Sequence, residues 1–302
     1  MTTLPNYVAV GAAIGLLLCG GSPTPADGTT GTDPKPDGDL RIVYLANAGF
    51  FLTDGERDLL VDALFGTGID GYAALPEGER AVLESGRPPY DDVDLALATH
   101  YHADHYDADA VARFLAANPR AVFVSTQQAV DELRDLDAGE AAIGRRAFGY
   151  RLDEGEVERR SIDGIDLRLF QLHHGRERPD IQNLGLLIEI CGLTVLHVGD
   201  TEADADDLRR AGLAGLEPDV ALLPSWFLRP GPWEAAVEVL RPRRIVAMHL
   251  PEADAPANYF WGEARSRDAL EATILRRHPD TFVPRTPGES VRIPCRPAAS
   301  TR

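Results

Sequence analysis

An apolar run at residues 93–98 leads directly into a cluster of polar side chains, and this junction constrains the fold more than any other feature. The cluster at residues 99–107 holds three of the eight histidines of the chain, together with Asp104 and Asp107. An apolar run that ends in this way is typical of a buried strand that delivers ligands to the following loop. Imidazole and carboxylate groups are ligands that ions such as Zn²⁺ prefer. The alternative is a polar loop that happens to be rich in histidine.

The same arrangement recurs along the chain. A histidine or an aspartate follows an apolar run at Asp62, at His173 and His174, at Asp200 and at His249. Taken singly, each has a simpler explanation, such as a turn residue, a helix cap or a satisfied buried imidazole. Because the placement recurs, chance explains the whole set poorly. We therefore expect these side chains to converge at one edge of a sheet assembly.

The remaining pattern predicts an α/β fold with two sheets and helices outside them. Strands are expected at 41–46, 49–52, 59–61, 121–125, 157–161, 165–172, 184–190, 193–197, 220–223, 245–247 and 291–293, and helices at 76–84, 107–118, 127–136, 203–213, 233–240 and 268–277. Residues 63–92 interrupt the regular order of strands. Such an excursion is either a functional lid or a surface embellishment.

The order of these polar side chains resembles the ligand pattern of the metallo-β-lactamase-fold hydrolases, over residues 40–296. The matching motifs are His100-x-His102-x-Asp104-His105, a later histidine at 173 or 174, Gly199-Asp200 and His249. The resemblance implies a four-layer αβ/βα sandwich of two mixed β-sheets with helices on the outer faces. More narrowly, Asn47-Ala48-Gly49-Phe50 and Leu60-Val61-Asp62 resemble the branch with ascorbate-6-phosphate lactonases and N-acyl-phosphatidylethanolamine phospholipase D.

The resemblance also implies a dinuclear metal site with two zinc ions per chain, or Mn or Fe in their place. One ion would be bound by His100, His102 and His174. The other would be bound by Asp104, His105 and His249, and the carboxylate of Asp200 would bridge the two ions. Asp104 and His105 are assigned to catalysis. His173 remains the alternative to His174, because adjacent strand residues point to opposite faces.

Two further residues are expected to support these ligands. Asp62 would orient the ligand imidazoles, as carboxylates often do around metal sites. His197 lies within a predicted hairpin, and we interpret it as structural or supporting and not as a ligand.

The implied activity is hydrolysis of an ester, lactone, amide or phosphodiester bond by a metal-bound hydroxide, since metal binding lowers the pKa of water to about 7. The substrate would be a small or lipid-like molecule. The net charge of −18 argues against a nucleic acid partner. Asp200 stands where many zinc β-lactamases carry cysteine, which argues against antibiotic hydrolysis as the main role. The alternatives are a phosphodiesterase for lipid or nucleotide fragments, and a metal-binding surface protein without turnover.

Several aromatic residues either line a pocket over the metals or belong to the core. They are Trp226-Phe227, Tyr259-Phe260-Trp261, and Tyr72 and Tyr90 in the 63–92 excursion.

The N-terminal residues predict export. Residues 8–18 are apolar and end in Leu16-Leu17-Leu18-Cys19-Gly20, a length that suits a signal peptide and is too short to span a membrane. This arrangement resembles the lipobox of bacterial lipoproteins, although no Lys or Arg precedes Cys19 and Leu18 replaces a small residue. We predict a signal peptide at 1–19, a flexible tether at 20–39 and a hydrolase domain at 40–298, lipid-anchored in the periplasm or at the cell surface. Plain secretion and an uncleaved anchor are the alternatives.

Apart from Cys19, the chain contains only Cys191 and Cys295. In an oxidising compartment these two residues either pair or remain isolated thiols, and their separation in the sequence does not decide between the two.

Overall fold

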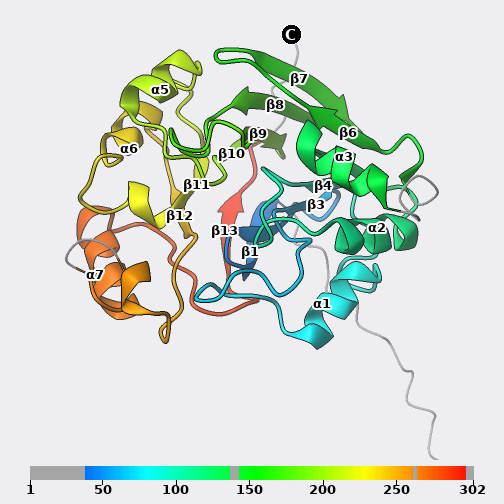
Figure 1. Cartoon of the computed structure of the whole chain (residues 1–302), viewed down its shortest axis with the longest axis horizontal. Helices are drawn as coiled ribbons and strands as arrows, with labels where there is room; N and C mark the ends of the chain where they lie inside the picture. The colour runs from blue at the N-terminus through cyan, green and yellow to red at the C-terminus, as the bar shows by residue number, and fades with distance from the viewer. Residues whose placement is uncertain (1–37, 137–142, 261–263, 297–302) are drawn as a thin grey trace, which may run out of the picture. The chain divides into compact units, whose positions relative to one another are not determined.

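The computed structural model describes residues 38–136, 143–260 and 264–296 (Figure 1). The predicted signal peptide, Cys19 and nearly all of the predicted tether lie outside the described residues, as does Trp261. Among the described helices, none combines the length and apolar character needed to cross a bilayer.

In the described part of the chain, thirteen strands form two mixed sheets. The first sheet has the order β13-β1-β2-β3-β4-β5-β6, with bounds Ser290–Pro294, Asp39–Ala46, Gly49–Thr53, Asp58–Val61, Leu95–Leu97, Val122–Thr126 and Ala147–Tyr150. The second has the order β12-β11-β10-β9-β8-β7, with bounds Ile245–Met248, Val220–Pro224, Leu193–His197, Leu184–Ile190, Ile165–Gln171 and Val157–Ile162. Strands β3 to β6 are parallel to one another, and so are β10, β11 and β12. The remaining neighbours are antiparallel.

The alternation of side chains along β1 shows how the layers are built. Leu40, Ile42 and Tyr44 belong to the apolar core between the sheets, whereas Val43 and Leu45 pack with the helices on the outer face. That outer face carries α1 (Glu77–Glu84), α2 (Ala108–Ala117) and α3 (Gln127–Asp135). Helices α5 (Ala205–Arg210), α6 (Ala235–Leu240) and α7 (Arg267–Arg277) lie on the flank of β11 and β12 (Figure 1). The predicted four-layer α/β sandwich is confirmed.

Most predicted elements are present with shifted ends, and local contacts explain where they begin. Helix α2 begins after Asp107, whose carboxylate accepts a hydrogen bond from the Ala110 N–H at 2.7 Å. Helix α5 is shorter than the predicted 203–213 because Asp204 caps it, in a reciprocal arrangement with Asp207. Strand β6 was not predicted, because its four residues include Gly149 and it is an edge strand that pairs only with β5.

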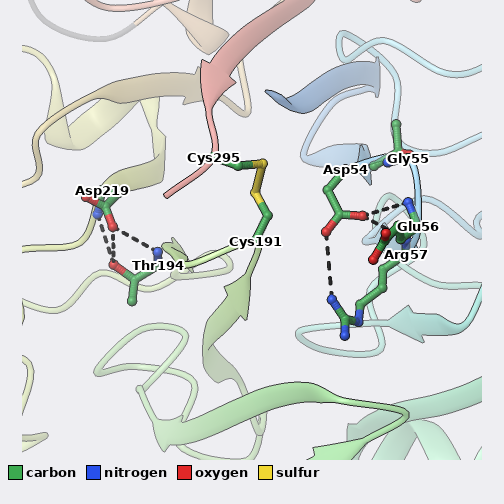
Figure 2. The surroundings of a disulfide bond; sticks show 9 residues. Asp54, Gly55, Glu56, Arg57, Cys191, Thr194, Asp219 and Cys295 are labelled. Atoms are coloured by element: carbon green, nitrogen blue, oxygen red, sulfur yellow. Dashed lines mark hydrogen bonds and ion pairs between the residues drawn. A yellow bond between two sulfur atoms is a disulfide. The ribbon is translucent and has the colours of Figure 1, made fainter. Parts of the chain in front are cut away.

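The disulfide between Cys191 and Cys295 joins the two sheets (Figure 2). Cys191 lies in the turn between β9 and β10, and Cys295 directly follows β13. The Cα atoms are 5.2 Å apart, within the usual range for a disulfide, and the two residues are 104 positions apart in the sequence. The Arg296 N–H also donates to the Cys191 carbonyl at 3.0 Å. Of the two alternatives left open by the sequence, the structure has the paired one.

We expect the double substitution Cys191→Ser/Cys295→Ser to lower the free energy of unfolding by about 2–4 kcal/mol, because the bond restricts a long loop of the unfolded chain. Denaturant unfolding of the variant, the oxidised protein and the reduced protein measures this effect. The variant and the reduced protein should agree. Equal stability of the oxidised and reduced proteins would contradict the prediction.

Candidate metal centre

The predicted site residues lie at the carboxyl ends of strands that run in the same direction. In the first sheet, Asp62 follows β3, and the cluster from His100 to His105 follows β4, which is parallel to β3. In the second sheet, His174, Asp200 and His249 follow β8, β10 and β12. Strands β8 and β10 are both antiparallel to β9, and β12 is parallel to β10 through β11. These strand ends therefore meet at one edge, as the sequence predicted.

The structure brings seven of these side chains together in two groups. The first group contains His100, His102 and His174, and within it the ring centroids are 4.6–5.0 Å apart. The second group contains Asp104, His105, Asp200 and His249. Within each group the potential ligand atoms lie within 4.8 Å of one another, which is the spacing of ligands around a single ion.

A turn after β4 explains how one loop serves both groups. The N–H groups of His105 and Tyr106 both donate to the His102 carbonyl at 2.9 Å, so the chain reverses there. His100 and His102 therefore lie before the turn and face His174. His105 follows the turn and faces the second group.

His173 and His174 have different partners in the structure. His173 Nε2 lies 2.9 Å from Asp207 Oδ2 in α5, and Asp207 also contacts Arg176. His174 lies with His100 and His102. The structure therefore places His174 in the first group, and His173 against Asp207 outside both groups.

Asp200 connects the groups electrostatically. Its Oδ1 is 3.2 Å from His105 Nε2 and its Oδ2 is 2.9 Å from His249 Nε2. Its charge also acts on the three histidines of the first group. This position between the groups suits the bridging role that the resemblance implies for Asp200.

The buried carboxylate of Asp62 fixes the orientation of two of the imidazoles. Asp62 Oδ2 lies 2.7 Å from His105 Nδ1 and accepts a hydrogen bond from Thr99 Oγ1 at 2.7 Å. The Thr99 hydroxyl in turn lies 3.0 Å from His100 Nδ1. Since the Thr99 hydroxyl donates to Asp62, it accepts from His100, and both histidines carry a proton on Nδ1. The neutral form of each, which binds a metal, therefore has its lone pair on Nε2, the atom that faces its group.

The donor atoms of the two groups fit a bound metal ion. Several buried side-chain atoms have no hydrogen-bond partner among the described residues outside the two groups themselves; they include Nε2 of His100, His105, His174 and His249, and Oδ1 of Asp104 and Asp200. Buried polar atoms are normally hydrogen-bonded, because leaving them unpaired costs free energy. Here the unpaired atoms are the ones through which imidazole and carboxylate coordinate metals.

Burial and charge act differently on the two groups. In the first group, burial lowers the pKa of His100 and lowers that of His174 to about 4, so both are neutral. In the second group, burial opposes charging, but the carboxylates of Asp200 and Asp104 outweigh it and raise the pKa of His249 to about 9. The pKa of His105 is raised in the same way. A cation that binds the second group therefore displaces protons.

Asn47 is a supporting residue whose role the sequence did not indicate. Its side-chain N–H donates to Asp104 Oδ2 at 2.9 Å, and its backbone carbonyl accepts from the backbone N–H of His249 at 3.2 Å. Asn47 adopts a left-handed conformation, with φ of 47°, in the tight turn between β1 and β2. His197 is buried and lies 3.0 Å from the Ala48 carbonyl through Nε2, so it supports the same turn and lies outside both ligand groups.

Aromatic rings pack around His249. The ring centroids of Tyr72 and Trp226 are 4.2 Å and 5.1 Å from that of His249, and Tyr259 lies 5.3 Å from Tyr72. The other predicted candidates are elsewhere: Phe227 and Phe260 are buried in the protein, and Tyr90 packs against Phe51 at 5.3 Å. Of the aromatic residues that the sequence left undecided, only some therefore lie at the site.

Comparisons with known proteins agree with this geometry. The model of the beta-lactamase superfamily domain matches residues 57–253. A UPF0173 metal-dependent hydrolase of Pyrococcus horikoshii is 31% identical over 84% of this chain and 100% of its own length. Two solved structures share the fold. One, a possible metal-dependent hydrolase from Veillonella parvula, has a TM-score of 0.55 and 20% identity, and the match covers 84% of this chain and 98% of that one. The other, an isothiocyanate hydrolase from Delia radicum gut bacteria, has a TM-score of 0.54, 16% identity and 84% and 100% coverage. The chain belongs to the beta-lactamase superfamily and is a metal-dependent hydrolase with the metallo-β-lactamase fold.

Proposed function

We propose that this hydrolase is a dinuclear zinc enzyme that cleaves an ester, lactone, amide or phosphodiester bond. The observation that carries the proposal is the pair of adjacent ligand groups. Within them, Nε2 of four histidines and Oδ1 of two aspartates are buried and have no hydrogen-bond partner among the described residues outside the groups. The histidine-rich first group suits zinc, with Mn or Fe as alternatives. Two bound metal ions would supply Lewis acidity and a water of lowered pKa at neutral pH.

The surrounding residues keep the ligand set in place. The Asp62 carboxylate and the Thr99 hydroxyl hold His105 and His100 in one tautomer. Asn47 holds Asp104 and the backbone of His249. Ligands fixed before the metal binds keep the site in its working geometry, which supports catalysis in preference to loose storage of metal.

A metal and substrate screen tests the proposal. The purified chain is loaded with Zn²⁺, Mn²⁺ or Fe²⁺ and assayed with 4-nitrophenyl butyrate, dihydrocoumarin, 4-nitroacetanilide and bis(4-nitrophenyl) phosphate. Hydrolysis of at least one substrate class, lost in chelator and restored by metal, is the expected result. Full activity in chelator contradicts the metal dependence, and no hydrolysis with any metal supports a binding protein without turnover.

We further propose that the domain is exported and anchored by a lipid on Cys19. The lipobox-like sequence before Gly20 and the polar segment behind it support this proposal. The Cys191–Cys295 disulfide supports it as well, because disulfides persist mainly in oxidising compartments.

Cys19→Ser should leave the protein without acyl chains and release it from membranes, because the thiol is the site of lipid attachment. Membrane fractionation and mass spectrometry of the protein expressed in a bacterium measure both effects. Cys191→Ser/Cys295→Ser is the control, since it removes the other two cysteines of the chain and should leave acylation intact. Unchanged acylation of Cys19→Ser would overturn the lipid anchor.

A further inference from the structure

Tyr72 is held beside the second ligand group by contacts with the loop that follows His249. Its ring meets that of His249 at 4.2 Å and an interplanar angle of 71°, and Tyr259 packs against it at 5.3 Å. An isolated β-bridge pairs Tyr72 with Pro251, and the Glu252 N–H donates to the Gly71 carbonyl at 2.9 Å. These contacts attach the 63–92 excursion to the loop that follows His249. They hold the Tyr72 ring beside the His249 imidazole.

The hydroxyl of Tyr72 has no hydrogen-bond partner among the residues that the structure describes, and the side chain is only half-buried. It lies close enough to Asp104 and Asp200 to interact with both charges. Tyrosine hydroxyls usually find a partner when they are buried, and a molecule bound over the second group would bury this one. With an ordinary pKa of about 10, a phenol is a hydrogen-bond donor at neutral pH. Its donor is therefore available to a molecule bound over the second group.

The surroundings of this hydroxyl indicate what kind of molecule it suits. The rings of Tyr72 and Trp226 both pack against the imidazole of His249, and the ring of Tyr259 packs against Tyr72. These aromatic surroundings of the second group favour a substrate with an apolar substituent. The carboxylates of Asp200 and Asp104 act on the Tyr72 hydroxyl more strongly than the guanidinium of Arg229 does, so the phenol keeps its proton. A neutral donor stabilises an oxygen that becomes negative only during the reaction, as a carbonyl oxygen does when a nucleophile adds to its carbon.

We propose that Tyr72 is a further catalytic residue, whose hydroxyl donates a hydrogen bond to the carbonyl oxygen of a carboxylic ester or lactone with an apolar substituent. The inference rests on the proposed hydrolase function and names its substrate class. As the carbonyl double bond opens, its electron pair moves to that oxygen, and the hydrogen bond strengthens there. The phenol keeps its proton throughout.

Tyr72→Phe tests the inference, because it removes the hydroxyl and keeps the ring that packs on His249. For 4-nitrophenyl butyrate and dihydrocoumarin, kcat should fall about 100-fold or more, the effect of losing one donor to a developing oxyanion. KM and the metal content should stay unchanged. Tyr90→Phe is the matched control, since Tyr90 belongs to the same excursion but packs against Phe51 away from the site.

A binding measurement provides a readout independent of turnover. Methyl phenylphosphonate carries a tetrahedral, negatively charged centre, and its affinity for the metal-loaded protein is measured by calorimetry. Tyr72→Phe should weaken this binding about tenfold or more, because a hydrogen bond to a charged group is lost. Tyr90→Phe should bind as the unmodified protein does.

The outcomes separate this inference from the proposed function. Ester hydrolysis that is equal in Tyr72→Phe and the unmodified protein overturns the role of Tyr72 and leaves the hydrolase proposal standing. Loss of metal from Tyr72→Phe also overturns it, since the residue would then be structural. If no substrate is hydrolysed at all, the proposed function fails, and phosphonate binding then tests the role of Tyr72. Equal affinity of Tyr72→Phe and the unmodified protein for the phosphonate, or no affinity of either, overturns the inference.

Discussion

Asp104→Ala is expected to reduce the metal content from about two ions to about one per chain and to lower kcat/KM by about a thousandfold or more. Asp104 belongs to the second group, and its Oδ2 lies 3.3 Å from His249 Nε2. The first group contains only histidines and stays complete. Loss of a residue that merely orients a ligand costs about 10- to 100-fold, so a larger effect marks Asp104 as a ligand.

Metal analysis of the dialysed protein and steady-state kinetics measure the two effects of Asp104→Ala together. Asp109→Ala is the control, since Asp109 is an exposed residue in the first turn of α2, close in the sequence and outside both groups. It should bind two ions and keep its activity. An Asp104→Ala protein that still binds two ions would remove Asp104 from the ligand set.

Gly199→Ala is expected to destabilise the fold by about 2–5 kcal/mol and to weaken metal binding. Gly199 has φ of 61°, a conformation that costs other residues about 1–2 kcal/mol. A Cβ atom there would also lie 2.2 Å from Asn183 Oδ1 and 2.9 Å from Thr99 Cβ. Asn183 accepts a hydrogen bond from the Asp200 N–H, and Thr99 connects Asp62 to His100, so neither moves without disturbing the site. Such overpacking adds about 1–3 kcal/mol.

Gly212→Ala separates the conformational contribution from the packing contribution to the loss of stability expected for Gly199→Ala. Gly212 also has a left-handed conformation, with φ of 76°, but no atom lies within 4 Å of its added Cβ. It should lose only the conformational part, about 1–2 kcal/mol, and keep its metal ions. Urea unfolding and metal analysis compare the two variants. Equal losses of stability would show that the packing around Gly199 does not carry the effect.

The strand ends explain how much of the site was predictable from the sequence. His100, Asp200 and His249 each follow an apolar strand, and parallel strands bring such positions to one edge whatever the details of packing. The sequence also indicated a supporting role for Asp62. Its hydrogen bonds to Thr99 and His105 agree with that role.

What the sequence did not indicate depends on contacts between distant residues. Asn47 reaches Asp104 across 57 positions, so its membership of a recognisable motif did not reveal which site residue it contacts. His173 and His174 are equivalent by alternation, and only Asp207 in α5 separates them. The two cysteines are 104 positions apart, so their pairing follows from the packing of β13 beside the β9–β10 turn. The contact of Tyr72 with His249 was likewise not indicated by the sequence, since it depends on a β-bridge between Tyr72 and Pro251.

Anomalous diffraction from crystals of the zinc-loaded protein is the most direct test of the dinuclear centre. We expect two peaks about 3.5–4 Å apart. One should lie about 2.0–2.2 Å from nitrogen atoms of His100, His102 and His174, and the other at that distance from Asp104, His105 and His249, with Asp200 between them. A single peak, or peaks away from these side chains, would contradict the dinuclear centre.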